Sequence, residues 1–277
     1  MNSTENPGGP AQSDKNDPAT EAAALAACES QFSTKSVVIL VALALLCAGA
    51  GWGLGELTHN LFPWDSAYVF NRYRDEIDKQ PPELRNGYIN SKVVSTRKVA
   101  DSKNAAIVYG ALGGCLGVAL GLLGTYLRAQ PRHAKITATA GFLLGIAAGA
   151  IPSFALVPYY FDNFNPRSTI ALPFLVHFGL WAGIGAAAGM ALSIGMGRWR
   201  DLGRGFIGGM GGVFAGTLLY HLINPALYPL DPDLPVPMRE ISRLVAALCV
   251  SLGAAIGSCG YLSSVRPGDP TSEVSIA

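Results

Sequence analysis

Charged residues are missing from six long stretches of this 277-residue chain. Only 14% of its residues are charged, against roughly 25% in a typical soluble domain. Asp, Glu, Lys and Arg are all absent from 36–55, 104–127, 136–161, 168–197, 205–230 and 244–265. Each stretch reaches the ~20 residues that a helix needs to cross ~30 Å of hydrocarbon. The core of a large soluble protein would need polar helices around such stretches, and the remaining sequence offers none. We therefore predict an all-α membrane protein with six transmembrane helices.

Other absences narrow the range of partners and cofactors. The formal net charge is +1 and no basic stripe is present, so we expect no nucleic-acid partner. The five cysteines form no CxxC pair, so we expect no structural zinc site. We also expect no other metal site and no cofactor. Four of them lie inside the apolar stretches (Cys47, Cys115, Cys249 and Cys259) and are interpreted as small packing residues, not as a disulfide framework.

The charges that remain divide the chain into three parts. Residues 1–35 are rich in Ser, Asn, Pro, Gly, Ala and acidic residues, which predicts a disordered acidic N-terminal tail. Residues 36–265 form the predicted six-helix transmembrane domain, with 57–103 as a long extracytoplasmic loop, and 266–277 form a short C-terminal tail. Within the loop, an amphipathic surface helix around 66–79 would end before Pro81 and Pro82. The long acidic lead disfavours a cleaved signal peptide, so the first apolar stretch is expected to stay as a membrane helix.

Basic residues predict the orientation of the chain. With six spans both termini lie on one side, where the short flanking segments carry Lys35, Arg128, Arg132, Lys135, Arg198, Arg200, Arg204 and Arg266. The short loops on the other side carry Arg167, Arg239 and Arg243. This difference predicts a multi-pass protein of the cell (inner) membrane with cytoplasmic N- and C-termini. The eight basic residues of the long first loop oppose this orientation, but long segments translocate with less regard to charge.

Glycine shows a periodic pattern that indicates an internal repeat. The pattern [LI]-G-x-A-x-G occurs at 116–121, 184–189 and 252–257, each 68 residues after the last (185 − 117 and 253 − 185). We predict three tandem helical hairpins packed through Gly-xxx-Gly faces, a glycine zipper, because small residues at i and i+4 let helices approach closely in lipid. The predicted packing residues are Gly117, Gly121, Gly145, Gly149, Gly185, Gly189, Gly212, Gly216, Gly253 and Gly257.

Four polar residues fall near the predicted outer ends of helices. Glu56 and His59 are three residues apart and share one helix face, while His177 and His221 lie in the fourth and fifth spans. A polar cluster at one depth of the membrane indicates a proton, metal or solute site. The alternative is that each side chain reaches separately to the interface. Convergence of the four residues around a cavity would decide between these interpretations.

Three catalytic or carrier motifs are approached but not matched. The sequence Gly55-Glu56-Leu57-Thr58-His59 has Gly where the zinc protease motif H-E-x-x-H has its first His. Ser258 and His221 would lie toward opposite faces of the membrane, too far apart for a serine protease of the rhomboid type. The carrier motif P-x-[DE]-x-x-[KR] is approached once, at 81–85, with the wrong spacing. We therefore expect no enzymatic activity.

Two sequences, one at the end of the first predicted helix and one within the fourth, carry a resemblance. GELTHNLFP (55–63) and LPFLVHFGLWAGIGAAAG (172–189), together with the short basic loops, resemble uncharacterised glycine-rich six-helix integral membrane proteins of bacteria. The likeness covers most of 36–262 and implies the architecture, with no known activity.

Two functional hypotheses remain. The first is a non-enzymatic compact bundle or homo-oligomer in the lipid bilayer, with a structural or scaffolding role through its tail and first loop. The alternative is a permease for a small solute or ion, with its site at Glu56, His59, His177 and His221.

Overall fold

The computed structural model describes residues 34–58, 61–128, 131–164, 171–229 and 234–263. Residues 1–33 of the predicted tail 1–35, the predicted tail 266–277 and His59 lie outside the described residues. Thr34 and Lys35 belong to the first described helix. Every regular element in the described ranges is a helix. The long helices are α2 (Thr34–Thr58), α5 (Pro82–Leu127), α6 (Ala134–Asn163), α7 (Ala171–Gly195), α8 (Leu202–Leu227) and α9 (Glu240–Ser263). Short helices are α3 (Ser66–Arg72), α4 (Arg74–Asp78), and the 3-10 turns η2 (Pro131–His133) and η3 (Trp199–Asp201).

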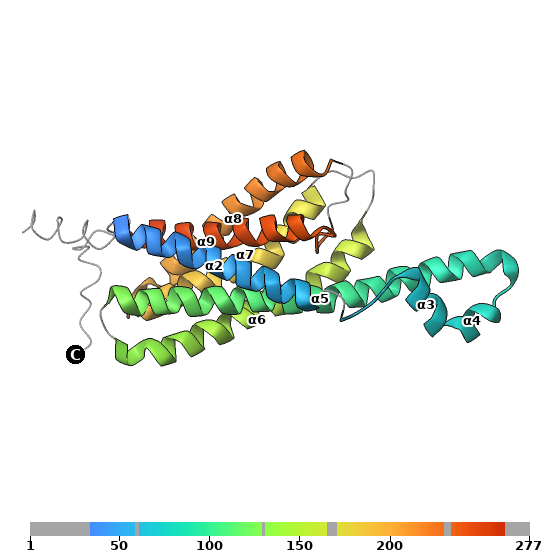
Figure 1. The fold of residues 1–277 in the computed structure, drawn as a ribbon, viewed down its shortest axis with the longest axis horizontal. Coiled ribbons are helices and arrows are strands. Elements are labelled where there is room, and N and C mark those ends of the chain that lie inside the picture. Colours follow the sequence, from blue (N-terminus) through green and yellow to red (C-terminus); the bar gives the residue numbers. More distant parts are fainter. Residues whose placement is uncertain (1–33, 59–60, 129–130, 165–170, 230–233, 264–277) are drawn as a thin grey trace, which may run out of the picture.

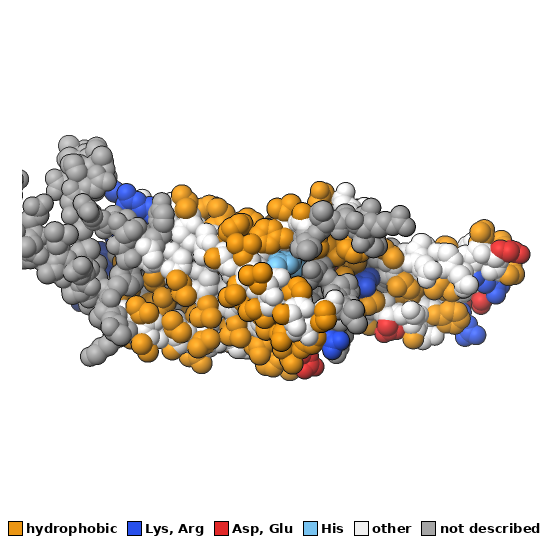
Figure 2. Space-filling model, turned by 90° about the horizontal axis from the view of Figure 1, so that it is seen from above, with side chains coloured by type: hydrophobic (Ala, Val, Ile, Leu, Met, Phe, Trp, Pro, Cys, Tyr) orange, Lys and Arg blue, Asp and Glu red, His pale blue; other side chains and the backbone are white. Residues whose placement is uncertain are grey.

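The six long helices are each long and apolar enough to cross a membrane, which agrees with a multi-pass membrane protein. Three of them, α5, α7 and α9, form the interior of the bundle. In an apolar 18-residue segment of each helix, the buried share of residues is 67% for α5, 67% for α7 and 56% for α9. The corresponding shares are 28%, 28% and 33% for α2, α6 and α8. These three outer helices expose large apolar side chains such as Leu46, Ile151 and Leu222, and hydrophobic side chains cover the visible face of the bundle (Figure 2). Such a surface suits lipid and not water.

Backbones approach closely where glycines of neighbouring helices meet. A Cβ atom built on Gly117 would lie 2.0 Å from the carbonyl oxygen of Gly141, between α5 and α6. A Cβ on Gly189 would lie 1.9 Å from the oxygen of Gly205, between α7 and α8. Of the ten glycines predicted to pack, all except Gly121 have a neighbouring backbone oxygen within 2.4 Å of such a Cβ. Side chains at these positions would force the helices apart.

The segment predicted as a long loop is largely helical and forms an arm that projects from one end of the bundle (Figure 1). Helix α5 begins at Pro82, where proline suits the first helical turn. Its 46 residues correspond to ~69 Å at 1.5 Å per residue, more than twice the ~30 Å of hydrocarbon. The predicted surface helix at 66–79 is split at Tyr73 into α3 and α4. We call residues 66–99 the helical arm.

The arm is held together by apolar contacts and charge pairs. Val69 and Ile77 are 0% and 2% exposed in the angle between the short helices and α5. Asp65 caps α3 by accepting a hydrogen bond from the amide of Tyr68 at 2.7 Å. Lys92 pairs with Glu76 across the arm at 3.0 Å. The arm is therefore a folded extension of the bundle.

Candidate functional site

The structure brings together two of the four polar residues singled out in the sequence. Nδ1 of His177 lies 3.1 Å from Nε2 of His221, so α7 and α8 meet through a histidine pair. Glu56 takes a different partner, Arg243 of α9, instead of joining this pair. His59 is outside the described residues.

The histidine pair is anchored to the backbone of the segment before α9. The other ring nitrogen of His177, Nε2, lies 2.9 Å from the carbonyl oxygen of Leu234. A carbonyl can only accept, so this Nε2 carries a proton and donates it. In a neutral His177 ring, Nδ1 then accepts from Nε2–H of His221. The direction of both hydrogen bonds follows from the single backbone carbonyl.

Aromatic rings enclose His177 completely. Its side chain is 0% exposed and stacks on Trp181 with ring centroids 4.8 Å apart. Tyr220 contacts the same ring edge-on at 5.4 Å. No solute can reach the imidazole of His177 without moving these rings, so its surroundings are those of a packed core residue.

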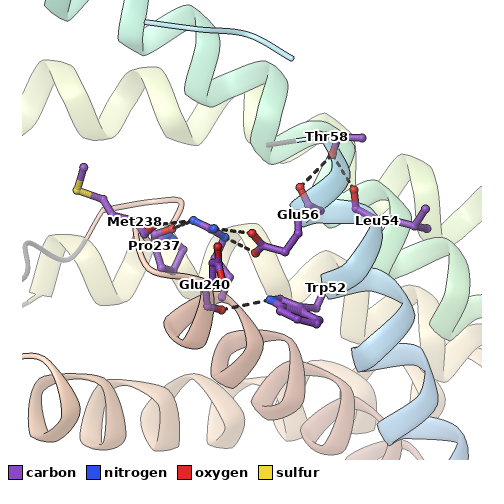
Figure 3. Close-up of polar contacts among 9 residues, drawn as sticks. Trp52, Leu54, Glu56, Thr58, Pro237, Met238 and Glu240 are labelled. Atoms are coloured by element: carbon purple, nitrogen blue, oxygen red, sulfur yellow. Dashed lines mark hydrogen bonds and ion pairs between the residues drawn. The ribbon is translucent and has the colours of Figure 1, made fainter. Parts of the chain in front are cut away.

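Glu56 and Arg243 form a two-pronged ion pair between α2 and α9. Nε and Nη2 of Arg243 donate to the two carboxylate oxygens of Glu56 at 2.6 and 2.7 Å. The same guanidinium donates from Nη1 to the carbonyl oxygens of Pro237 and Met238 at 2.9 and 2.7 Å. The Arg243 side chain is 7% exposed and that of Glu56 is 22% exposed. Figure 3 shows Glu56 directed from α2 toward the backbone that carries Pro237 and Met238.

Both polar clusters donate hydrogen bonds to the backbone of one short stretch of chain, residues 234–238, which we call the clamped segment. It precedes α9 without forming a helix, and all of its residues except Met238 are buried. A non-helical segment buried at the end of a membrane bundle must find donors for its carbonyl groups, because hydrocarbon offers none. Those donors are His177, the hydroxyl of Tyr109, which donates to Pro235 at 2.7 Å, and Arg243.

Sequence reasoning missed Tyr109, Trp181 and Arg243 as members of this site. One signal was present for Tyr109: it precedes His177 by 68 residues, the same offset that separates Gly117 from Gly185. Arg243 offered only its position as the last charged residue before the sixth apolar stretch. Its partner is 187 positions away, a distance that no local pattern reveals.

The space beside the ion pair is small and apolar. A cavity of about 20 Å³ lies between α2, α5, α9 and the clamped segment, and its wall includes Glu56, Tyr109, Trp181 and Arg243. This volume is comparable to the room that one water molecule needs. No group of three His, Cys, Asp or Glu side chains among the described residues is placed to hold a metal ion.

Side chains of α5, α7 and α9 therefore donate hydrogen bonds to the buried clamped segment, and Glu56 of α2 holds the arginine of α9 in place. Searches of protein-family models, of curated proteins and of solved structures find no match to this chain.

Proposed function

We propose that the chain is a non-enzymatic, multi-pass membrane protein whose rigid bundle holds the helical arm outside the bilayer as a scaffold for a partner. The observation that carries this proposal is the clamped segment. Three polar side chains of the alternative permeation site have structural partners instead. His177 donates to the carbonyl of Leu234 and contacts His221, and Glu56 accepts from Arg243. Groups used in this way hold the described helices together, which supports a structural role.

Two helix pairs of the bundle correspond to each other in their glycine contacts. Gly117 on α5 meets Gly141 on α6, and Gly185 on α7 meets Gly209 on α8, each position 68 residues after its counterpart. The offset extends to Tyr109 and His177, which both donate to the clamped segment. These correspondences support an internal repeat with glycine faces as its packing surfaces. A second copy of the chain remains a candidate partner within the membrane.

The proposed orientation places the arm outside the cytoplasm and the termini inside. The connections from α5 to α6 and from α7 to α8 lie at the end of the bundle remote from the arm (Figure 1). The sequence at these connections is basic and includes Arg128, Arg198 and Arg204. The positive-inside rule assigns this end to the cytoplasm of a cell (inner) membrane. The arm then extends into the space beyond that membrane.

Reconstitution separates this proposal from the permease alternative. The purified protein in liposomes is expected to leave the membrane as tight to protons and K⁺ as protein-free liposomes, measured with an internal pH dye and a K⁺ electrode. His177→Ala and Glu56→Ala should not change this. A flux carried by the native protein, and lost in either variant while that variant elutes as a folded species, would overturn the scaffold proposal.

Cross-linking tests the arm itself. A photoreactive amino acid at Leu84, which is 60% exposed on the arm, is compared with one at Ile151, which is 68% exposed on α6. In cells that express the protein at its natural level, Leu84 should yield a discrete protein adduct and Ile151 should yield none. Adducts of equal kind and amount from both positions would contradict a docking role for the arm.

A further inference from the structure

A second cavity, larger than the first, lies where the arm leaves the bundle. It is open on one side, has a volume of about 350 Å³ and is lined by residues 61–63, by Tyr68 and Arg72 of α3 with Tyr73, and by residues of α5 between Ser95 and Lys103. Its walls combine aromatic rings, hydroxyl groups and two basic side chains, and no acidic residue lines it. The proposed scaffolding role makes no use of this cavity.

The two basic side chains in its wall, Arg72 and Lys103, lack an acidic partner among the described residues. Arg72 donates to the hydroxyl of Tyr68 at 2.8 Å, and Nζ of Lys103 lies 5.0 Å from the centroid of the Phe62 ring. Neighbouring basic residues outside the cavity behave differently. Lys98 pairs with Asp162 at 2.6 Å and Arg97 with Asp101 at 3.3 Å. Arg72 and Lys103 therefore place in the wall of the cavity two positive charges that have no acidic partner in the described part of the chain.

A hydroxyl group in the wall also lacks a partner. The side-chain oxygen of Thr96 is buried and makes no hydrogen bond in the structure, although Thr96 lines the cavity. A buried hydroxyl without a partner carries a free-energy cost, which a bound acceptor would remove. Two cations suit the oxygens of a phosphate group, which is anionic and accepts several hydrogen bonds, and the hydroxyl of Thr96 becomes a further donor once its side chain turns toward the cavity.

The position of the cavity favours a lipid as the source of that phosphate. Lys103 immediately precedes the charge-free stretch 104–127, so it marks the edge of the hydrocarbon. Leu61 and Val99, which both line the cavity, are 58% and 54% exposed. The site thus combines two exposed basic side chains with an exposed apolar rim at the depth of lipid headgroups. Aromatic residues such as Phe62 and Tyr68 are typical of that depth.

We propose that this cavity binds the phosphate headgroup of an anionic phospholipid, held by Arg72, Lys103 and Thr96. The acyl chains of the lipid lie against the exposed apolar rim. The inference uses the membrane placement of the proposed function but is independent of any partner of the arm. A bound headgroup joins α3 to α5 at the base of the arm and so fixes the direction in which the arm leaves the membrane.

Lipid binding is measured on the whole purified protein by native mass spectrometry and by thermal melting, with added phosphatidylglycerol or phosphatidylcholine. Phosphatidylglycerol should bind more tightly and raise the melting temperature, and phosphatidylcholine should not. Each basic residue near a membrane surface contributes about fivefold to the affinity for anionic lipid, so the variant Arg72→Gln/Lys103→Gln should bind phosphatidylglycerol roughly 30-fold more weakly. Equal binding of the two lipids by the native protein would overturn the proposal.

A matched control separates the cavity from general surface charge. Arg74→Gln/Lys79→Gln removes the same charge from the arm outside the cavity wall, and it should retain native affinity. An equal loss in both double variants would refute a specific site. Thr96→Val keeps shape and charge and should also weaken binding, which preserves the test if the double variant fails to fold.

Inorganic phosphate distinguishes the two sources of the anion. Millimolar phosphate should not raise the melting temperature or displace phosphatidylglycerol, because it lacks the acyl chains that use the apolar rim. Full displacement at that concentration would identify a soluble phosphate compound as the ligand and would refute the lipid assignment. Lipid binding that persists while flux through the protein is also found would leave this site intact and overturn only the scaffold proposal.

Discussion

Substitution of Gly117 by alanine should destabilise the bundle by a predictable amount. A Cβ at this position would lie 2.0 Å from the carbonyl oxygen of Gly141, whereas real Cβ atoms essentially never come closer than 3.0 Å to another heavy atom. The backbones of α5 and α6 must therefore separate by at least 1.0 Å, the difference between these two distances. Separation there also loosens the contact of Gly113 with Gly145, one turn away on α5. Overpacking of this kind costs about 1–3 kcal/mol.

Gly211 on α8 provides the matched control, because a Cβ there would meet no heavy atom within 4 Å. Alanine has a higher helix propensity than glycine by about 1 kcal/mol, so Gly211→Ala should be neutral or stabilising while Gly117→Ala is destabilising. At about 2–4 °C per kcal/mol for a chain of roughly this size, Gly117→Ala should lower the melting temperature in detergent by about 2–12 °C. If the two variants shift the melting temperature in the same direction, the close-approach reasoning is wrong.

Three further predictions concern polar contacts. Glu56→Ala should lower the melting temperature, because it leaves Arg243 with a buried charge that has no carboxylate partner. The loss of stability should be smaller than the ~3–5 kcal/mol expected for a fully buried pair, since Glu56 is 22% exposed. If the second change Arg243→Met restores stability, the buried charge is the cause; if the double variant is as unstable as Glu56→Ala, it is not. Tyr109→Phe removes one hydrogen bond to the clamped segment and should cost about 1–3 kcal/mol in chemical unfolding, as expected for a buried acceptor without a donor; an unchanged unfolding midpoint would count against the clamp. Hydrogen bonds from Tyr88 and Lys92 lower the pKa of Glu76, so this carboxylate stabilises the arm at neutral pH, and the contribution is lost as the pH falls through the lowered pKa. Cleavage of the native protein between α4 and α5 by an acid-active protease should therefore become faster at acidic pH. If Glu76→Gln is cleaved at the native rate at every pH, this contact is not the cause.

The membrane spans could be predicted because the cost of burying charge in hydrocarbon is large and local. The six charge-free stretches lie within, or overlap, the six long helices. The continuation of α5 into the helical arm was not predicted, because the distribution of charged residues indicates where the hydrocarbon ends and not where a helix ends. Between 83 and 103 the sequence has no proline and only one glycine, so nothing breaks the helix as it leaves the bundle.

The candidate site could be predicted only for residues that lie at the same depth in the membrane on adjacent helices. His177 and His221 lie near the ends of adjacent spans, and the structure places their rings in contact. Glu56 was assigned to the same group because its neighbour His59 shares its helix face, but its actual partner Arg243 comes from α9. The clamped segment itself is short and irregular, with prolines at 235 and 237. Such a segment has no periodicity, so its burial depends on tertiary contacts that sequence patterns do not record.

Access to the clamped segment tests the central claim most directly. Cysteine introduced at Val236, which is 6% exposed, is compared with cysteine at Met238, which is 50% exposed, by the rate of reaction with a water-soluble maleimide, located by mass spectrometry. We expect slow labelling at 236 and fast labelling at 238, and labelling at 236 should accelerate when Tyr109→Phe and His177→Ala remove two of the donors to the segment. Labelling at 236 that matches 238 in the native background, or that does not respond to loss of the clamps, would show that these polar side chains do not serve to hold the segment.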